Sequence, residues 1–316
     1  MVQRWFAVLV ASAWFTGCVR SAAPGAVQRV HPRIAQDFDA PHVAEADAES
    51  HEYQTYRYIE RAGTALRLYV FRPSPGVRPS AAVLLFHSGG WTRGRPEWLF
   101  GLAKQFSGLG LVAIPVQYRL SKDGLTPLDA LADACAAFRW VRQHAAELKV
   151  DPNQVAGWGA SAGGHLVATA ATAGCPETGE EEFSGAPNAL LLVSGGIDPE
   201  RSIQFRKLIG ETVDVSRYSP LRNVKPEGPP TLLITGVEDS VTRQASAEAF
   251  CEAVRSTGTL CVLVSFPRLG HLLTRRLDDQ RSSLDPDPQA EQEAYVVQEH
   301  FLRSIGFVSA AAPAEP

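Results

Sequence analysis

The sequence predicts an α/β fold, in which helices cover both faces of a largely parallel sheet. Short, continuously apolar runs, such as AAVLLF at 81–86 and PTLLITG at 230–236, alternate with longer segments of helical periodicity. Such runs are typical of strands buried on both faces, and intervening helices let successive strands pair in parallel. Glycines follow several of the runs, and ligands of such sheets bind beyond the carboxyl ends of the strands.

The expected elements follow in chain order. Two paired strands are expected at 53–60 and 66–73, ahead of the main sheet. The sheet strands are expected within 81–90, 111–120, 154–161, 188–196, 230–236 and 259–267. Helices are expected at 127–150, 162–174, 242–258 and 289–306, where apolar residues recur at helical spacing. The region 198–228 is too short for a large lid, and the Asp-rich segment 275–289 is expected to be a surface loop.

One folded domain is expected, at 53–306. The chain shows no internal repeat, and its 316 residues, 45% of them hydrophobic, suffice for one large core. Residues 18–52 are rich in Ala, Pro, Asp and Glu without a sustained period, which predicts a flexible tether, and 307–316 are expected to be a disordered tail. The net charge of −4 and the lack of a long Lys/Arg run argue against nucleic acid as a partner.

Residues 1–17 have the features of an export signal. A basic Arg4 precedes an apolar stretch from Trp5 to Phe15, and small residues lead to Cys18. The ending FTGC resembles a bacterial lipobox, which implies cleavage before Cys18 and lipidation of that cysteine, although Phe15 stands where Leu is usual. Val19, rather than Asp, implies a lipid anchor in the outer membrane of a Gram-negative cell envelope. The alternative is an ordinary cleaved signal in which Cys18 is incidental.

Four cysteines lie beyond Cys18: Cys135, Cys175, Cys251 and Cys261. An exported chain is able to form disulfides, and four cysteines allow three pairings among which the sequence does not choose. None of them forms a CxxC pair, which argues against a zinc or redox site. Buried free thiols are the alternative.

Ser161 lies in Gly159-Ala160-Ser161-Ala162-Gly163, between an expected strand and an expected helix. This matches G-x-S-x-G, in which a nucleophilic serine occupies a strained turn and the glycines remove side chains that would clash. The N-terminus of the following helix favours developing negative charge. The alternatives are a helix cap, or small residues that only let a helix pack closely on the sheet.

A serine nucleophile needs a base, and the base needs an orienting acid. Asp239 follows the strand at 230–236, and His271 follows the strand at 259–267. The order Ser161, Asp239, His271 is that of α/β-hydrolases. Asp239 could instead be a helix cap, with Glu238 or Asp198 as the acid.

The loop after the strand at 81–86 contains Gly89 and Gly90, whose N–H groups, with that of Ala162, could receive an oxyanion. His87 is expected to brace this loop. Four further side chains are candidates for the substrate pocket: His87, Ser88, Trp91 and His165. For Trp91 and His165, packing in the core is the alternative.

These residues resemble the α/β-hydrolase esterases. FHSGGW, VQYRL, DPNQVAGWGASAGGHL, YSPLRNV, PPTLLITGVED and GH stand in the order found in BD-FAE-like and hormone-sensitive-lipase-like carboxylesterases, which include acetyl-xylan and feruloyl esterases. The resemblance covers residues 53 to about 305. It implies an α/β-hydrolase fold, with nucleophile, acid, base and oxyanion donors as assigned above. Those families usually have HGGG, and Ser88 stands here in place of the first glycine.

The expected reaction is hydrolysis of a short-acyl ester through an acyl-enzyme, without a metal or an organic cofactor. The expected substrate is a small-molecule or carbohydrate ester, because no extensive apolar lid is visible. An arylformamidase-like amidase or a peptidase would use the same three side chains. From another class, a non-catalytic surface lipoprotein could bind a ligand or partner through the cleft. The sequence does not determine the oligomeric state.

Overall fold

The computed structural model describes residues 52–61, 63–74, 81–175 and 183–309. The expected signal peptide, Cys18 and all but the last residue of the expected tether lie outside these ranges. In the described part of the chain, no helix combines the length and the apolar character that a membrane span requires.

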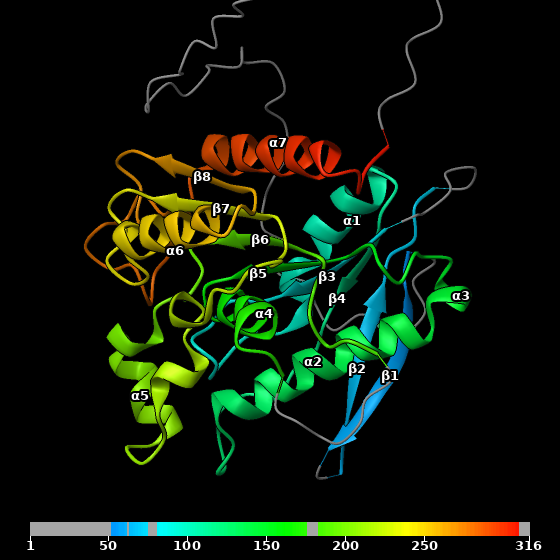
Figure 1. Cartoon of the computed structure of the whole chain (residues 1–316), viewed down its shortest axis with the longest axis horizontal. Coiled ribbons are helices and arrows are strands. Elements are labelled where there is room, and N and C mark those ends of the chain that lie inside the picture. The colour runs from blue at the N-terminus through cyan, green and yellow to red at the C-terminus, as the bar shows by residue number, and fades with distance from the viewer. Residues whose placement is uncertain (1–51, 62, 75–80, 176–182, 310–316) are drawn as a thin grey trace, which may run out of the picture. The chain divides into compact units, whose positions relative to one another are not determined.

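The main sheet contains the six strands that the sequence predicts, all parallel, in the order β4-β3-β5-β6-β7-β8 (Figure 1). Their bounds are β3 (Ala82–Phe86), β4 (Val112–Pro115), β5 (Val155–Ala160), β6 (Ala189–Val193), β7 (Thr231–Gly236) and β8 (Cys261–Phe266). The expected antiparallel pair is also present, as β1 (Gln54–Arg61) and β2 (Thr64–Val70). Single bridges connect Leu68 to Val116 and Phe71 to Ala113, so the pair lies beside the outer strand β4.

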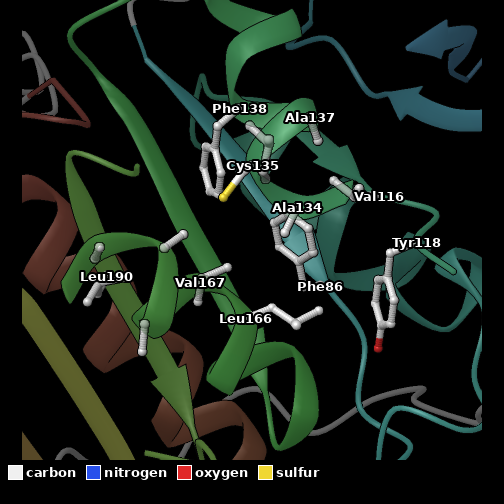
Figure 2. Close-up of a cluster of buried hydrophobic side chains, with 14 of the residues drawn as sticks. Phe86, Val116, Tyr118, Ala134, Cys135, Ala137, Phe138, Leu166, Val167 and Leu190 are labelled. Atoms are coloured by element: carbon white, nitrogen blue, oxygen red, sulfur yellow. The ribbon is translucent and has the colours of Figure 1, made fainter. Parts of the chain in front are cut away.

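Helices cover both faces of the sheet. One core contains side chains of α2 (Pro127–Gln143), α4 (Ala162–Thr172) and α6 (Gln244–Ser256), and the other contains those of α1 (Phe100–Gly108) and α7 (Pro288–Ser304). Successive residues of β3 alternate between the two cores, because neighbouring side chains of a strand point to opposite faces. Both faces are buried, so the strand is apolar throughout. Figure 2 shows the first core, to which the sheet contributes Phe86 and Leu190, α2 contributes Phe138 and α4 contributes Leu166.

The structure differs from the sequence prediction in four places. The helix expected at 127–150 ends at Gln143, and a separate short helix, α3 (Ala145–Leu148), follows His144, whose φ and ψ are −102° and 19°. Helix α1 and the short helix α5 (Ile203–Ile209) were not expected. The folded part extends past the expected boundary at 306, because Phe307 and Val308 are 7% and 5% exposed and belong to the second core. Residues 310–316 of the expected tail lie outside the described residues.

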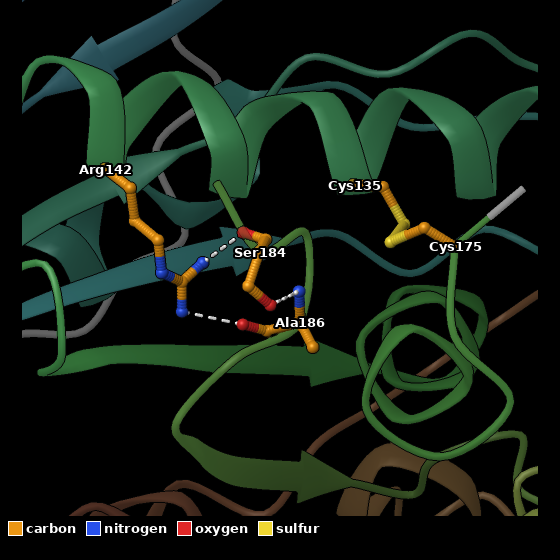
Figure 3. Close-up of a disulfide and its surroundings, with 5 residues drawn as sticks. All are labelled: Cys135, Arg142, Cys175, Ser184 and Ala186. Atoms are coloured by element: carbon orange, nitrogen blue, oxygen red, sulfur yellow. Dashed lines mark hydrogen bonds between the residues drawn. A yellow bond between two sulfur atoms is a disulfide. The ribbon is translucent and has the colours of Figure 1, made fainter. Parts of the chain in front are cut away.

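The four cysteines form two disulfides, Cys135–Cys175 and Cys251–Cys261. The first connects Cys135 in α2 to Cys175, which lies three residues after the end of α4 (Figure 3). Near it, Arg142 of α2 donates hydrogen bonds of 2.7 Å to the carbonyl oxygens of Ser184 and Ala186. Burial lowers the pKa of Arg142 to about 10. The disulfide and the guanidinium therefore both hold the connection before β6 against α2.

Candidate active site

Ser161 lies at the sharp turn between β5 and α4. Its φ of 50° and ψ of −112° belong to a region that residues with a side chain rarely adopt. The N–H of Ser161 donates to the carbonyl oxygen of Val193 at 3.0 Å, and its carbonyl oxygen accepts from the N–H groups of His165 and Gly196. These hydrogen bonds hold the strained turn, so that the partly buried serine lies at the carboxyl edge of the sheet.

The two glycines of the motif are required by close approach of the backbone. A Cβ on Gly159 would lie 2.4 Å from the carbonyl oxygen of Gly163, and a Cβ on Gly163 would lie 2.1 Å from that of Phe86. Both distances are far inside van der Waals contact. The small residues therefore allow this turn to pack against the end of β3, as expected for a nucleophile turn.

His271 and Asp239 follow neighbouring strands of the sheet. Asp239 follows β7, and His271 begins a short 3-10 turn, η5 (His271–Leu273), after β8. The Nδ1 atom of His271 lies 2.9 Å from Oδ2 of Asp239, and its Nε2 atom lies 2.9 Å from Oγ of Ser161. Histidine and aspartate are each 5% exposed. The structure thus joins the three side chains in the order that proton transfer from a serine hydroxyl requires.

Asp239 is held as a carboxylate. Burial alone would raise its pKa, but the hydrogen bond and charge of His271, together with hydrogen bonds from Thr242, lower the pKa of Asp239 to about 2. Thr242 donates from its hydroxyl to Oδ2 at 2.7 Å and from its N–H to Oδ1 at 2.8 Å. Thr242 is not among the residues predicted from the sequence, although a threonine three residues after an aspartate is a common local hydrogen-bonding pattern.

Neither alternative acid contacts the base. Asp198 pairs with Arg201 at 3.0 Å and accepts a 3.4 Å hydrogen bond from Ser246. Glu238 is exposed. Among the described residues, the carboxylate at Nδ1 of His271 is that of Asp239.

The loop with Gly89 and Gly90 lies next to the nucleophile turn because of the strand order. The chain passes from β3 to β4 on one side and then to β5 on the other side of β3, and clefts form at such a switch point. Gly89 and Gly90 have φ of 117° and 60°, which glycine adopts without a Cβ clash. Within the described residues, neither N–H donates a hydrogen bond to the protein. Ala162 is the first residue of α4, so its N–H has no intrahelical acceptor.

Two interactions support this glycine loop. The carbonyl oxygen of Gly89 accepts from the N–H groups of Thr92 and Arg93, both at 3.2 Å. The carbonyl oxygen of Gly90 accepts from Nε2 of Gln204 at 2.9 Å. Both carbonyls are thereby turned toward protein donors. Gln204 belongs to α5, and the sequence carried no local signal that would associate it with the loop.

His87 and His165 lie in the interior, which differs from the expectation that they line a substrate pocket. They are 1% and 0% exposed. His87 stacks on Tyr118, with ring centroids 4.2 Å apart, and its Nδ1 lies 2.7 Å from the carbonyl oxygen of Ser88. This agrees with a bracing role. Nε2 of His165 lies 3.0 Å from the carbonyl oxygen of Tyr218, well away from the base position.

Trp91 belongs to an aromatic cluster under the glycine loop. It is 6% exposed, and its ring makes edge contacts with His165 and Phe205 at centroid distances of 5.4 and 5.1 Å. Gly196 lies between this cluster and the nucleophile, since a Cβ there would lie 3.8 Å from Cζ2 of Trp91 and 3.5 Å from the carbonyl oxygen of Ser161. Ser88, the fourth candidate, is partly buried.

Comparison with known proteins agrees with this geometry. Esterase LipC of Mycobacterium tuberculosis is 31% identical over 243 residues, which are 68% of this chain and 60% of LipC. The chain thus spans less than two thirds of the length of that relative. The structure of Thermogutta terrifontis esterase 2 phosphoramylated by tabun matches with a TM-score of 0.73 and 29% identity. The match covers 84% of this chain and 98% of the esterase chain. The propionate-bound form of the same esterase matches with a TM-score of 0.72 and 28% identity, over 83% of this chain and 97% of the esterase chain.

The family follows from a direct match. A family model described as BD-FAE matches residues 68–254, a range that contains Ser161, Asp239 and the glycine loop. The chain therefore has an α/β-hydrolase fold and belongs to the BD-FAE family of esterases.

Proposed function

We propose that this protein is a serine carboxylesterase that hydrolyses short-acyl esters through an acyl-enzyme formed on Ser161. The observation that carries the proposal is the chain of two 2.9 Å contacts from Ser161 Oγ through His271 to Asp239. A hydroxyl is a poor nucleophile unless a base takes its proton as it attacks. His271 is placed to do so, because Nε2 faces the hydroxyl while Nδ1–H donates to Asp239.

The reaction has two halves. Ser161 Oγ attacks the ester carbonyl carbon as its proton passes to Nε2 of His271, and the collapse of the tetrahedral intermediate expels the alcohol, which takes that proton. Water then attacks the acyl-serine in the same way and releases the acid. Asp239 stays ionised and stabilises the imidazolium that forms in each half.

The negative charge that develops on the carbonyl oxygen needs nearby donors. The N–H groups of Gly89, Gly90 and Ala162 are the donors that we propose. Removing one such donor from an acyl-transfer enzyme typically costs about 3 kcal/mol of transition-state stabilisation. The N-terminus of α4 adds a favourable dipole at the same point.

A short acyl group is supported by two observations. Aromatic side chains of Trp91 and Phe205 fill the interior behind Gly196, next to the nucleophile. The similar Thermogutta terrifontis esterase 2 has been solved with propionate and with butyrate bound. We propose a small-molecule or carbohydrate ester as the substrate, with an acyl group of that size.

The test uses the full chain and p-nitrophenyl acetate, butyrate and octanoate, beside Ser161→Ala. Hydrolysis that favours acetate or butyrate and is lost in the variant supports the proposal. If the folded protein turns over none of the three and does not react with a fluorophosphonate probe, the esterase proposal fails and a ligand-binding role takes its place. Labelling by the probe without ester turnover would favour an amidase or a peptidase.

We also propose that residues 1–17 are a signal peptide and that Cys18 is lipidated, which would anchor the protein in the outer membrane. The support is the FTGC motif after an apolar stretch. In a Gram-negative host, the full chain is expected in the outer-membrane fraction and Cys18→Ala in the soluble periplasmic fraction. Equal membrane association of the two would reject lipidation at Cys18.

A further inference from the structure

Gln280 is a buried polar residue in a segment that is otherwise exposed or partly exposed. It lies in the connection between η5 and α7, and it is the one buried residue of 275–287, with 6% exposure. The sequence predicts a surface loop here, and the mechanism above makes no use of it. A glutamine that gives up solvent in such a loop needs hydrogen-bond partners inside the protein.

Apart from a 3.4 Å hydrogen bond to the carbonyl oxygen of Leu277, the partners of Gln280 are backbone groups of the base and of the residues beside the acid. Its Oε1 atom accepts from the N–H of His271 at 2.9 Å and from the N–H of Ser240 at 3.0 Å. Its Nε2 atom donates to the carbonyl oxygen of Glu238 at 2.9 Å. Glu238 and Ser240 flank Asp239. The side-chain amide of Gln280 therefore binds the backbone on both sides of the acid, and it also binds the backbone N–H of the base, His271.

The backbone around the amide leaves space for it. A Cβ on Gly270 would lie 2.6 to 2.8 Å from the three terminal atoms of the Gln280 side chain. Any residue other than glycine before His271 would therefore displace the amide. Gly270 and Gln280 are thus matched to each other, although Gln280 lies nine positions from the base along the chain.

We propose that Gln280 is a positioning residue, which sets the imidazole of His271 relative to the carboxylate of Asp239 by tying together the two loops that carry them. The proposal rests on the proposed esterase function. An amide suits this place because one end accepts and the other donates, and because it adds no charge beside the base. A carboxylate would keep the acceptor end but turn its second oxygen toward the carbonyl oxygen of Glu238.

Misplacement of the imidazole has a distinct kinetic signature. His271 must protonate the departing alkoxide, and an alkyl alkoxide depends on that proton far more than p-nitrophenolate, which leaves readily without it. A misplaced base should therefore slow an alkyl ester more than a p-nitrophenyl ester of the same acid. Loss of fold stability alone would reduce both in proportion.

The experiment compares the full chain with Gln280→Met on ethyl butyrate and p-nitrophenyl butyrate, well below the melting temperature of each protein. Methionine keeps the length of the side chain and removes its hydrogen bonds. We expect kcat/KM, which reports formation of the acyl-enzyme, to fall by about tenfold on the aryl ester and to fall further on the alkyl ester, in keeping with the large effect of small misplacements on catalysis. Gln289→Met is the control, since Gln289 is exposed and its side chain, within the described ranges, bonds to Glu293 alone. It should change neither rate.

The outcomes separate the two proposals. A wild-type kcat/KM for Gln280→Met on both esters, or an equal fall in kcat/KM on both, would overturn the positioning role and leave the esterase function standing. No turnover by the wild type on either ester would remove the esterase function and the positioning role with it. Gln280→Glu keeps the Oε1 acceptor but sets its second oxygen against the carbonyl oxygen of Glu238, so its kcat/KM should stay below that of the wild type. A wild-type value would overturn the role of the Nε2 donor.

Discussion

Nε2 of His271 lies 2.9 Å from Oγ of Ser161, although 110 positions separate the two residues in the chain. The contact exists because β5 and β8 both end at the carboxyl edge of one parallel sheet. The serine hydroxyl is thereby hydrogen-bonded to the side chain that takes its proton.

Replacing Asp239 by Asn should therefore spare binding and damage catalysis. Asparagine would leave Nδ1 of His271 without its carboxylate and favour the wrong tautomer. In serine hydrolases this lowers kcat by about 10⁴. Steady-state kinetics on p-nitrophenyl butyrate provide the measurement, with circular dichroism to verify folding. A folded Asp239→Asn protein with nearly wild-type kcat would exclude Asp239 as the acid.

Gly163→Ala should disrupt the nucleophile turn. The added methyl would lie 2.1 Å from the carbonyl oxygen of Phe86, so the turn must move, and we expect a loss of stability of about 1–3 kcal/mol together with lower kcat. Gly101→Ala in α1 is the matched control, because nothing lies within 4 Å of its added Cβ, and it should stabilise the protein by about 0.5–1 kcal/mol. Urea denaturation measures both, and equal midpoints for the two variants would contradict the steric argument.

The two disulfides should contribute differently to stability. They close separations of 40 and 10 positions, for which the chain-entropy model gives about 4 and about 3 kcal/mol. We expect paired alanine variants of Cys135 and Cys175 to lower the urea midpoint more than those of Cys251 and Cys261. The opposite order would show that local packing, rather than loop closure, dominates the effect.

Stability should decline as the pH falls from about 6.5 to about 4, because burial lowers the pKa of both His87 and His165 from 6.5 to about 4. In this window the unfolded chain binds protons that the folded protein does not, so acid favours unfolding. Each histidine contributes a slope of up to about 1.4 kcal/mol per pH unit. His165→Phe should remove one such slope, which urea titrations at pH 7.0, 5.5 and 4.5 would detect. An unchanged slope would contradict the burial of a neutral His165.

The sequence by itself determined the strands of a largely parallel sheet, the strained serine turn and the Ser161, Asp239, His271 order along the chain. These features are local: an apolar run is visible as a run, and Gly159 and Gly163 lie two residues from the serine that they serve. The carboxyl ends of parallel strands meet at one edge, so the sequence also predicted that the three side chains would meet.

Only the tertiary structure decided which cysteines pair, where α2 ends, and which polar side chains support the site. Thr242 was detectable in principle because its partner is three residues away, whereas Gln204 contacts Gly90 across 114 positions and Gln280 contacts Ser240 across 40. Side chains of this kind take their role from groups that folding brings to them. The residues next to them in the sequence do not indicate that role. The sequence around Gln280 therefore predicts only a surface loop.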